Sequence, residues 1–210
     1  MKIDSNFDLK KLENKINIIK NKLRVGKSDE VIRDTKSLIK KFSDQQILYN
    51  ILSLAYQQKG ENDKSIDLLT NVLKKNPKNI FFLNNMGVSY YNKKNLVEAE
   101  YYFKRVLEIN PNYINALNNL GNLKKDLDLV DEAMNFYKKS IKLDDNVMET
   151  HFNLGVLYEQ SGNFEKSLYH YKKTLEINPK FTKADHSIAM MTEYSSKNKH
   201  FLDMQKKLTD

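Results

Sequence analysis

Apolar residues recur along this chain at the three- and four-residue spacing of one helix face. Leu83, Met86 and Tyr90 mark one such segment, and EAEYYFKRVLEINP contains the next. Short polar turns such as QKGENDK and QSGNFEK separate the two members of each pair of segments. The pattern therefore predicts an all-α chain built from successive helical hairpins.

The hairpins repeat with a fixed period. All six Gly and all three Pro residues fall into three columns at multiples of 34 residues. The columns are Pro77, Pro111 and Pro179; Gly87, Gly121 and Gly155; and Gly26, Gly60 and Gly162. A fixed period between about 20 and 50 residues indicates stacked repeats.

The proline column sets the repeat boundaries. The predicted segments are an N-terminal extension at 1–11, a degenerate repeat at 12–45, and full repeats at 46–79, 80–113, 114–147 and 148–181. Residues 182–210 are expected to form C-terminal capping helices, because a stack must cover its last apolar face. Phe201 and Met204 in this segment leave self-association through the ends of the array as an alternative.

Residues 46–194 resemble the tetratricopeptide repeat (TPR) family. The matching positions are Leu83, Met86, Gly87, Tyr90, Ala99, Phe103 and Pro111, then Leu117, Leu120, Gly121, Ala133 and Tyr137, then His151, Leu154, Gly155, Tyr158, Tyr171 and Pro179. The resemblance implies a right-handed superhelix, an α-solenoid of antiparallel helical hairpins. Gly87 and Ala99 should let the two helices of one hairpin approach closely, while Tyr90 and Phe103 fill the space between hairpins.

The repeat at 114–147 departs from the family pattern at two positions. Lys124 replaces a Tyr that the other full repeats carry, and Asp145 replaces the proline. We expect this repeat to be the more plastic one. The charged head of Lys124 should reach solvent along its apolar stem.

Asparagines form a second stripe on the first helix of that repeat. Asn115, Asn118, Asn119 and Asn122 have the same spacing as the core stripe but lie on an adjacent face. Each Asn costs a helix interior about 0.7 kcal/mol relative to Ala. Asn119 also has counterparts one period away, Asn85 and Asn153. In the TPR family the first helices line the inner, concave face, so the resemblance places these amides in one groove.

An amide offers one acceptor and two donors, which match the C=O and N–H groups of an extended peptide. The arrangement is similar to the groove of the repeat domain in O-linked N-acetylglucosamine transferase, where an asparagine ladder holds the bound peptide. The predicted groove residues are Asn85, Asn119, Asn153, Asn50, Asn84, Asn118, Asn122, Phe81, Tyr91 and Phe152, with Tyr194 as a further aromatic candidate. Two alternatives stay open: an Asn-rich chain places Asn on any wet face, and aromatics at helical spacing often only pack.

The sequence predicts a non-enzymatic scaffold that binds an extended segment of a partner protein. The alternative is the substrate-recognition arm of a larger glycosyltransferase or sulfotransferase whose catalytic domain is absent from these residues. HSIAMMTEYSSKNKHFLDMQKKL resembles the tail that joins TPR arrays to sulfotransferase domains. A groove that clamps the C-terminal carboxylates of chaperones is disfavoured, because its Lys and Arg are missing and Glu149 would repel the carboxylate.

The charge and composition narrow the partner class. The formal net charge is +8, but only three of the 35 basic residues are Arg. Since nucleic-acid readers depend on Arg forks, nucleic acid is disfavoured as a partner. No cysteine is available for disulfides or thiolate chemistry, and no stretch is apolar enough for a membrane helix. We therefore expect a cytoplasmic protein without a membrane partner.

Two weaker motifs give no cofactor site. Gly26, Lys27 and Ser28 match the end of a phosphate-binding loop, but Asn21 stands where its first glycine belongs. A helix turn with Ser28 as N-cap explains the same letters. The four histidines are His151, His170, His186 and His200, and none lies four residues from another. We expect no metal, no cofactor and no catalytic residues, and we expect His151 to pack in the core.

Overall fold

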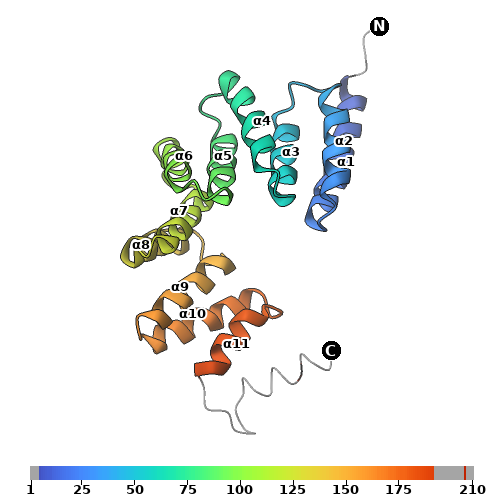
Figure 1. Ribbon diagram of the computed structural model, residues 1–210. Helices are drawn as coiled ribbons and strands as arrows, with labels where there is room; N and C mark the ends of the chain where they lie inside the picture. Colours follow the sequence, from blue (N-terminus) through green and yellow to red (C-terminus); the bar gives the residue numbers. More distant parts are fainter. Residues whose placement is uncertain (1–4, 192–205, 207–210) are drawn as a thin grey trace. The chain divides into compact units, whose positions relative to one another are not determined.

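The computed structural model describes residues 5–191 and residue 206. In this part of the chain we find eleven helices and no strand (Figure 1). The helices are α1 Ser5–Arg24, α2 Ser28–Ile39, α3 Gln46–Gln58, α4 Asn62–Lys75, α5 Ile80–Asn92, α6 Leu96–Ile109, α7 Ile114–Asp126, α8 Val130–Leu143, α9 Met148–Gln160, α10 Phe164–Ile177 and α11 Thr182–Met191. The predicted all-α class is therefore confirmed.

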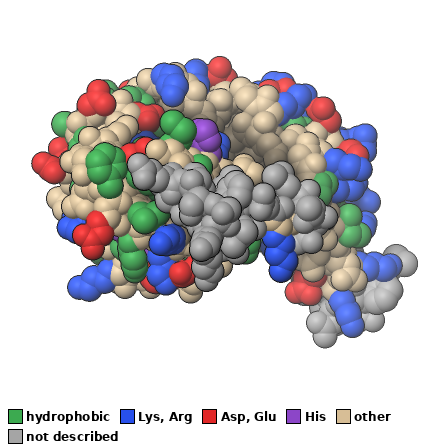
Figure 2. Space-filling view, turned by 90° about the horizontal axis from the view of Figure 1, so that it is seen from below, with side chains coloured by type: hydrophobic (Ala, Val, Ile, Leu, Met, Phe, Trp, Pro, Cys, Tyr) green, Lys and Arg blue, Asp and Glu red, His purple; other side chains and the backbone are tan. Residues whose placement is uncertain are grey.

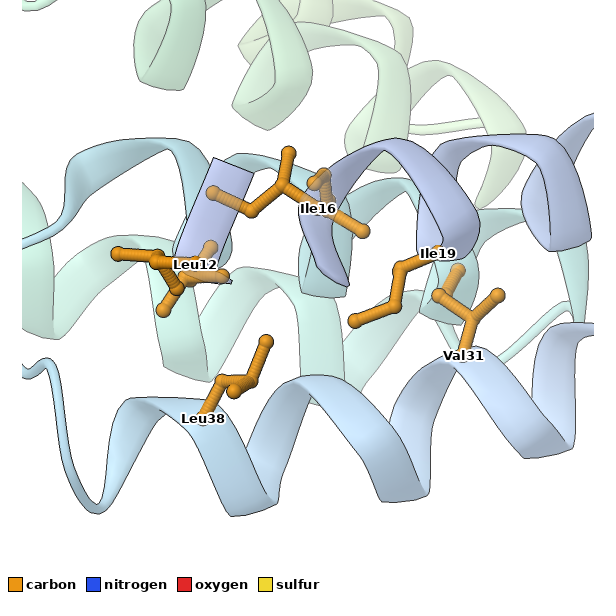
Figure 3. Close-up of a cluster of buried hydrophobic side chains, with 8 residues drawn as sticks. Leu12, Ile16, Ile19, Val31 and Leu38 are labelled. Carbon is orange, nitrogen blue, oxygen red and sulfur yellow. The ribbon is translucent and has the colours of Figure 1, made fainter. Parts of the chain in front are cut away.

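The chain folds as two compact units, Met1–Pro111 with α1–α6 and Asn112–Asp210 with α7–α11. In the first unit, Leu12, Ile16 and Ile19 of α1 face Val31 and Leu38 of α2 in an apolar cluster (Figure 3). Residues of α3 complete this cluster, so the first hairpin buries its apolar face against the next one. Three consecutive helices therefore share the N-terminal core.

The second unit is built on the same plan. Tyr137 of α8 packs with Leu154 and Leu157 of α9, and all three side chains are fully buried. Helix α11 places Ala184 and Ile188 against Tyr171 of α10. The remainder of the predicted capping segment, including Tyr194, Phe201, Leu202, Met204 and Leu208, lies outside the described residues.

From α3 to α10 the hairpins are uniform. Each first helix has 13 residues and each second helix has 14. The repeat at 114–147 keeps these lengths although it lacks the proline. Asp144 ends α8 in an extended conformation (φ −150°), as Asn110 does before Pro111. Its plasticity stays a prediction.

Close approach within three of the hairpins depends on the column of Gly87, Gly121 and Gly155. A Cβ built on Gly87 would lie 2.5 Å from a ring carbon of Phe103, and one on Gly121 would lie 2.4 Å from Tyr137. Gly155 has the same relation to Tyr171. Real Cβ atoms do not approach other atoms so closely, so glycine is required beside these rings. The predicted role of Gly87 is confirmed.

Two expectations about side chains are wrong. The side chain of Lys124 is 10% exposed, and its Nζ lies 3.0 Å from the carboxylate of Glu132 rather than in solvent. Glu132, whose side chain is 52% exposed, neutralises the Lys124 charge, so the ammonium group does not have to reach the solvent. Ser28 is the first residue of α2 and not its N-cap, since Lys27 occupies the cap position. The Ser28 hydroxyl instead donates to Gln58 Oε1 on α3 at 2.6 Å.

Left-handed residues end the first helices. Gly60 and Gly162 have φ of 78° and 75°, but the same position in the other two full repeats holds Lys94 (φ 61°) and Asp128 (φ 57°). The left-handed region costs an L-residue about 1–2 kcal/mol, whereas glycine enters it freely. We therefore expect Lys94→Gly to raise the free energy of unfolding by about 0.5–1 kcal/mol in urea titrations. Lys94→Ala, which keeps the strain, should show no gain, and equal behaviour of the two variants would contradict the account.

Candidate functional site

The predicted groove residue Asn85 lies inside the first unit. Its side chain on α5 is 6% exposed. Its amide nitrogen donates to Asn50 Oδ1 at 2.6 Å and to Ser53 Oγ at 2.9 Å, both on α3. Because these bonds use both amide hydrogens, Asn85 ties two neighbouring first helices together.

Gln57 strengthens the same junction, and the sequence reasoning missed it. Its Nε2 donates to the backbone oxygen of Asn85 at 2.7 Å and to Ser89 Oγ at 2.9 Å. Gln57 stands 34 residues before Tyr91, so the repeat phase already placed it on the asparagine face. The signal was lost because Gln, Tyr, Lys and Glu occupy that position in successive repeats.

An equivalent junction joins α7 and α9 in the second unit. Asn153 Nδ2 donates to Asn122 Oδ1 at 2.9 Å, and Asn153 Oδ1 accepts from Lys125 Nζ at 3.0 Å. Asn122 Oδ1 also accepts the hydroxyl of Tyr137 at 2.6 Å. Amides therefore link the first helices in both units, through different pairs of positions.

A third amide contact lies near the start of α9. Thr150, which is fully buried, donates from Oγ1 to Asn118 Oδ1 at 2.8 Å. Asn119 is half-buried on the same helix as Asn118, whereas Asn84 in the first unit is 7% exposed. Asn85 belongs to the first unit, and Asn119 and Asn153 belong to the second. One continuous column through all three stays a prediction.

Two of the linked asparagines keep unused donors. Asn50 and Asn122 each accept through Oδ1, and their amide N–H groups have no hydrogen-bond partner among residues 5–191. Both side chains are half-buried. Each unit thus presents one amide whose orientation is fixed by its acceptor bond and whose donors remain available.

The aromatic candidates differ in their surroundings. Phe81 is 54% exposed on α5. Tyr91 is half-buried, with Lys94 Nζ 5.6 Å from the centre of its ring. Phe152 packs against Tyr171 and Phe181, with ring centres 5.6 and 5.0 Å apart. Phe152 therefore contributes to the core at the end of the second unit, and Phe81 has the most exposed side chain of the three.

Lys125 is a further polar residue that the sequence reasoning did not select. Its side chain is half-buried on α7, and burial lowers the pKa of its ammonium group below the ordinary value. The described residues place no carboxylate oxygen within 4 Å of its Nζ. Its hydrogen bond to Asn153 places this charge within the amide junction.

Two histidines are in contact in the second unit, although the sequence did not predict this contact. His151 is fully buried, as predicted, and its Nδ1 lies 3.0 Å from Nδ1 of His170. Nε2 of His151 lies 3.0 Å from the backbone oxygen of Asp145. Burial and the neighbouring His151 lower the pKa of His170 to about 4. Within the described residues no three His, Asp or Glu side chains are grouped to hold a metal ion.

Side chains of both charges are exposed. Figure 2 shows Lys and Arg side chains as well as Asp and Glu side chains among the described residues on the face in view. None of the described helices combines the length and the apolar character needed to cross a membrane.

Comparison with solved structures shows the fold. The chain is similar to TTC0263, a thermophilic TPR protein of Thermus thermophilus, with a TM-score of 0.74 and 18% identity over 85% of this chain and 97% of that one. It is similar to MamA, with a TM-score of 0.60 and 22% identity over 79% and 97% of the two chains. YrrB, a TPR protein with an unusual peptide-binding site, matches with a TM-score of 0.57 and 20% identity over 83% and 90%.

Among curated proteins, none matches this sequence. Models of the tetratricopeptide repeat match residues 80–113, 114–147 and 149–181. The narrower likenesses, to the transferase groove and to the sulfotransferase-linked tail, stay predictions. The three matched segments therefore belong to the tetratricopeptide repeat family, and the chain has the all-α solenoid fold of that family.

Proposed function

We propose that this protein is an interaction scaffold whose first helices bind an extended peptide segment of a partner protein. Its TPR repeats and its similarity to TPR structures, one of them with a peptide-binding site, support the general role. The amide junctions support the particular mode. The alternative role as the recognition arm of a larger transferase stays a prediction.

The observation that carries the proposal is the pair of unused amide donors. Asn50 and Asn122 are held in place through Oδ1, while their N–H groups are open. A peptide carbonyl that meets such a donor forms a hydrogen bond without an entropy cost for orienting the side chain. In this mode Asn85 and Asn153 orient the side chains of Asn50 and Asn122, and the N–H groups of Asn50 and Asn122 bind the guest peptide.

The test uses peptides selected against the full chain from a displayed library of random 15-residue sequences. Uncharged selected peptides are then measured against Asn50→Asp and Asn122→Asp by fluorescence polarisation. Aspartate keeps an oxygen for the internal bonds but has no N–H to donate. We expect each variant to bind about five- to tenfold more weakly, because each leaves one peptide carbonyl without its donor.

The matched controls are Asn71→Asp on α4 and Asn135→Asp on α8, two exposed positions on second helices. They make the same change in charge and should leave the affinity unchanged. All four variants should keep the helical circular dichroism. Wild-type affinity in both Asn50→Asp and Asn122→Asp would contradict this binding mode.

A further inference from the structure

Lys125 stands out among the charged side chains of the second unit. Its Nζ carries three hydrogens, and Asn153 Oδ1 accepts one of them. The neighbouring Lys124 is already paired with Glu132. The described residues thus leave Lys125 with two unused donors and an ammonium charge that is half removed from water.

The acidic residues near this helix do not neutralise Lys125. Asp126 follows it directly and is exposed, and it raises the pKa of the ammonium group less than burial lowers it. Glu159, one repeat further on, accepts the hydroxyl of Tyr171 at 2.6 Å. A carboxylate of a bound partner would form charge-assisted hydrogen bonds with this half-buried ammonium group. Such bonds are stronger than those to a neutral acceptor.

Lys125 also lies beside the open amide of Asn122, because both residues contact Asn153. A peptide whose backbone is held by Asn122 would place nearby side chains within reach of Nζ. The corresponding position in the other full repeats holds Gln57, Tyr91 and Glu159, so a cation occurs there once in these four repeats.

From this arrangement we infer that the guest segment carries an Asp or Glu side chain that binds Lys125, beside the backbone contact at Asn122. The inference rests on the proposed peptide binding and names one chemical feature of the partner. An acidic residue is required at one point of the guest over the second unit. The first unit places no such demand at Gln57 or Tyr91, which carry no positive charge.

The experiment starts from the same displayed library, in which the peptides are fused through their C-termini and present no free terminal carboxylate. Selected sequences should share an enriched Asp or Glu at one position. That residue is then exchanged for Asn or Gln in synthetic amidated peptides. We expect about a tenfold loss of affinity for the wild-type protein and no loss for Lys125→Gln, which keeps a donor for Asn153 without the charge.

Two further variants sharpen the result. Lys125→Glu should prefer peptides in which the acidic residue is replaced by Lys, and Lys142→Gln, an exposed change on α8, should behave as wild type. Selection of peptides without an enriched acidic position would overturn the inference and leave the groove intact. An equal loss of affinity in wild type and Lys125→Gln would also overturn it. Failure to select any peptide would overturn the groove itself.

Discussion

Gly87→Ala is expected to lower the free energy of unfolding by about 1 kcal/mol, the net of an overpacking cost and a smaller helix gain. A methyl group on this residue would lie 2.5–2.6 Å from two ring carbons of Phe103, which is fully buried. The ring cannot move away without opening the contact between α5 and α6. Overpacking of this kind costs about 1–3 kcal/mol, which exceeds the gain of about 1 kcal/mol when Ala replaces Gly in a helix. Urea titration followed by circular dichroism measures the loss.

The preceding repeat shows how this clash can be relieved. There, Ser53 stands in place of Gly87 and Leu69 in place of Phe103, and both are fully buried. In that repeat the residue facing the second helix has a Cβ, and the side chain opposite it is Leu, which is smaller than Phe. We expect Phe103→Leu to rescue Gly87→Ala, so that the double variant is at least about 1 kcal/mol more stable than the sum of the single effects predicts. Strict additivity would contradict direct contact as the cause.

The repeat architecture could be predicted from the sequence because its signals are local. Helical spacing and the 34-residue columns of Gly and Pro mark each hairpin and each turn. The strained turns could also have been predicted from the sequence. Lys94 and Asp128 fill the two gaps in the column of Gly26, Gly60 and Gly162, where the backbone is left-handed.

The faces of the helices were also predictable, but the use of each polar group was not. The phase placed Asn85 beside the neighbouring first helix, yet it did not show that Asn50 and Ser53 take both of its amide hydrogens. A displacement of less than about 1 Å is enough to make or break a hydrogen bond. The period of the repeat does not define the rotation of each helix that precisely. For the same reason the sequence did not reveal that Lys124 meets Glu132.

The histidine pair escaped prediction because its members come from different helices. His151 and His170 are 19 residues apart, and only the packing of α10 on α9 brings their rings together. In the preceding repeat the same two positions hold Leu117 and Phe136. Two titratable rings thus occupy places where that repeat uses apolar side chains.

Acidification from pH 7 to pH 4.5 is expected to destabilise the second unit through His170. The pKa of His170 is lowered to about 4 from its ordinary 6.5 by burial, by His151 and by Lys138, against the opposing effect of Asp145. Between these values the unfolded chain binds more protons than the folded chain, so the free energy of unfolding falls as the pH falls. Each pH unit in this window is worth about 1.4 kcal/mol, which gives a loss of about 2–3 kcal/mol.

The bond pattern gives the physical reason for this loss. If His151 donates from Nε2 to the backbone oxygen of Asp145, its Nδ1 accepts from Nδ1–H of His170. An added proton on His170 would then lie on Nε2 and place a positive charge on a buried ring. The double variant His151→Leu with His170→Phe copies the preceding repeat, and it should lose about 2–3 kcal/mol less than wild type over this pH range in urea titrations. The comparison cancels the carboxylates that both proteins share, so an equal loss in the two proteins would show that the histidine pair does not cause it.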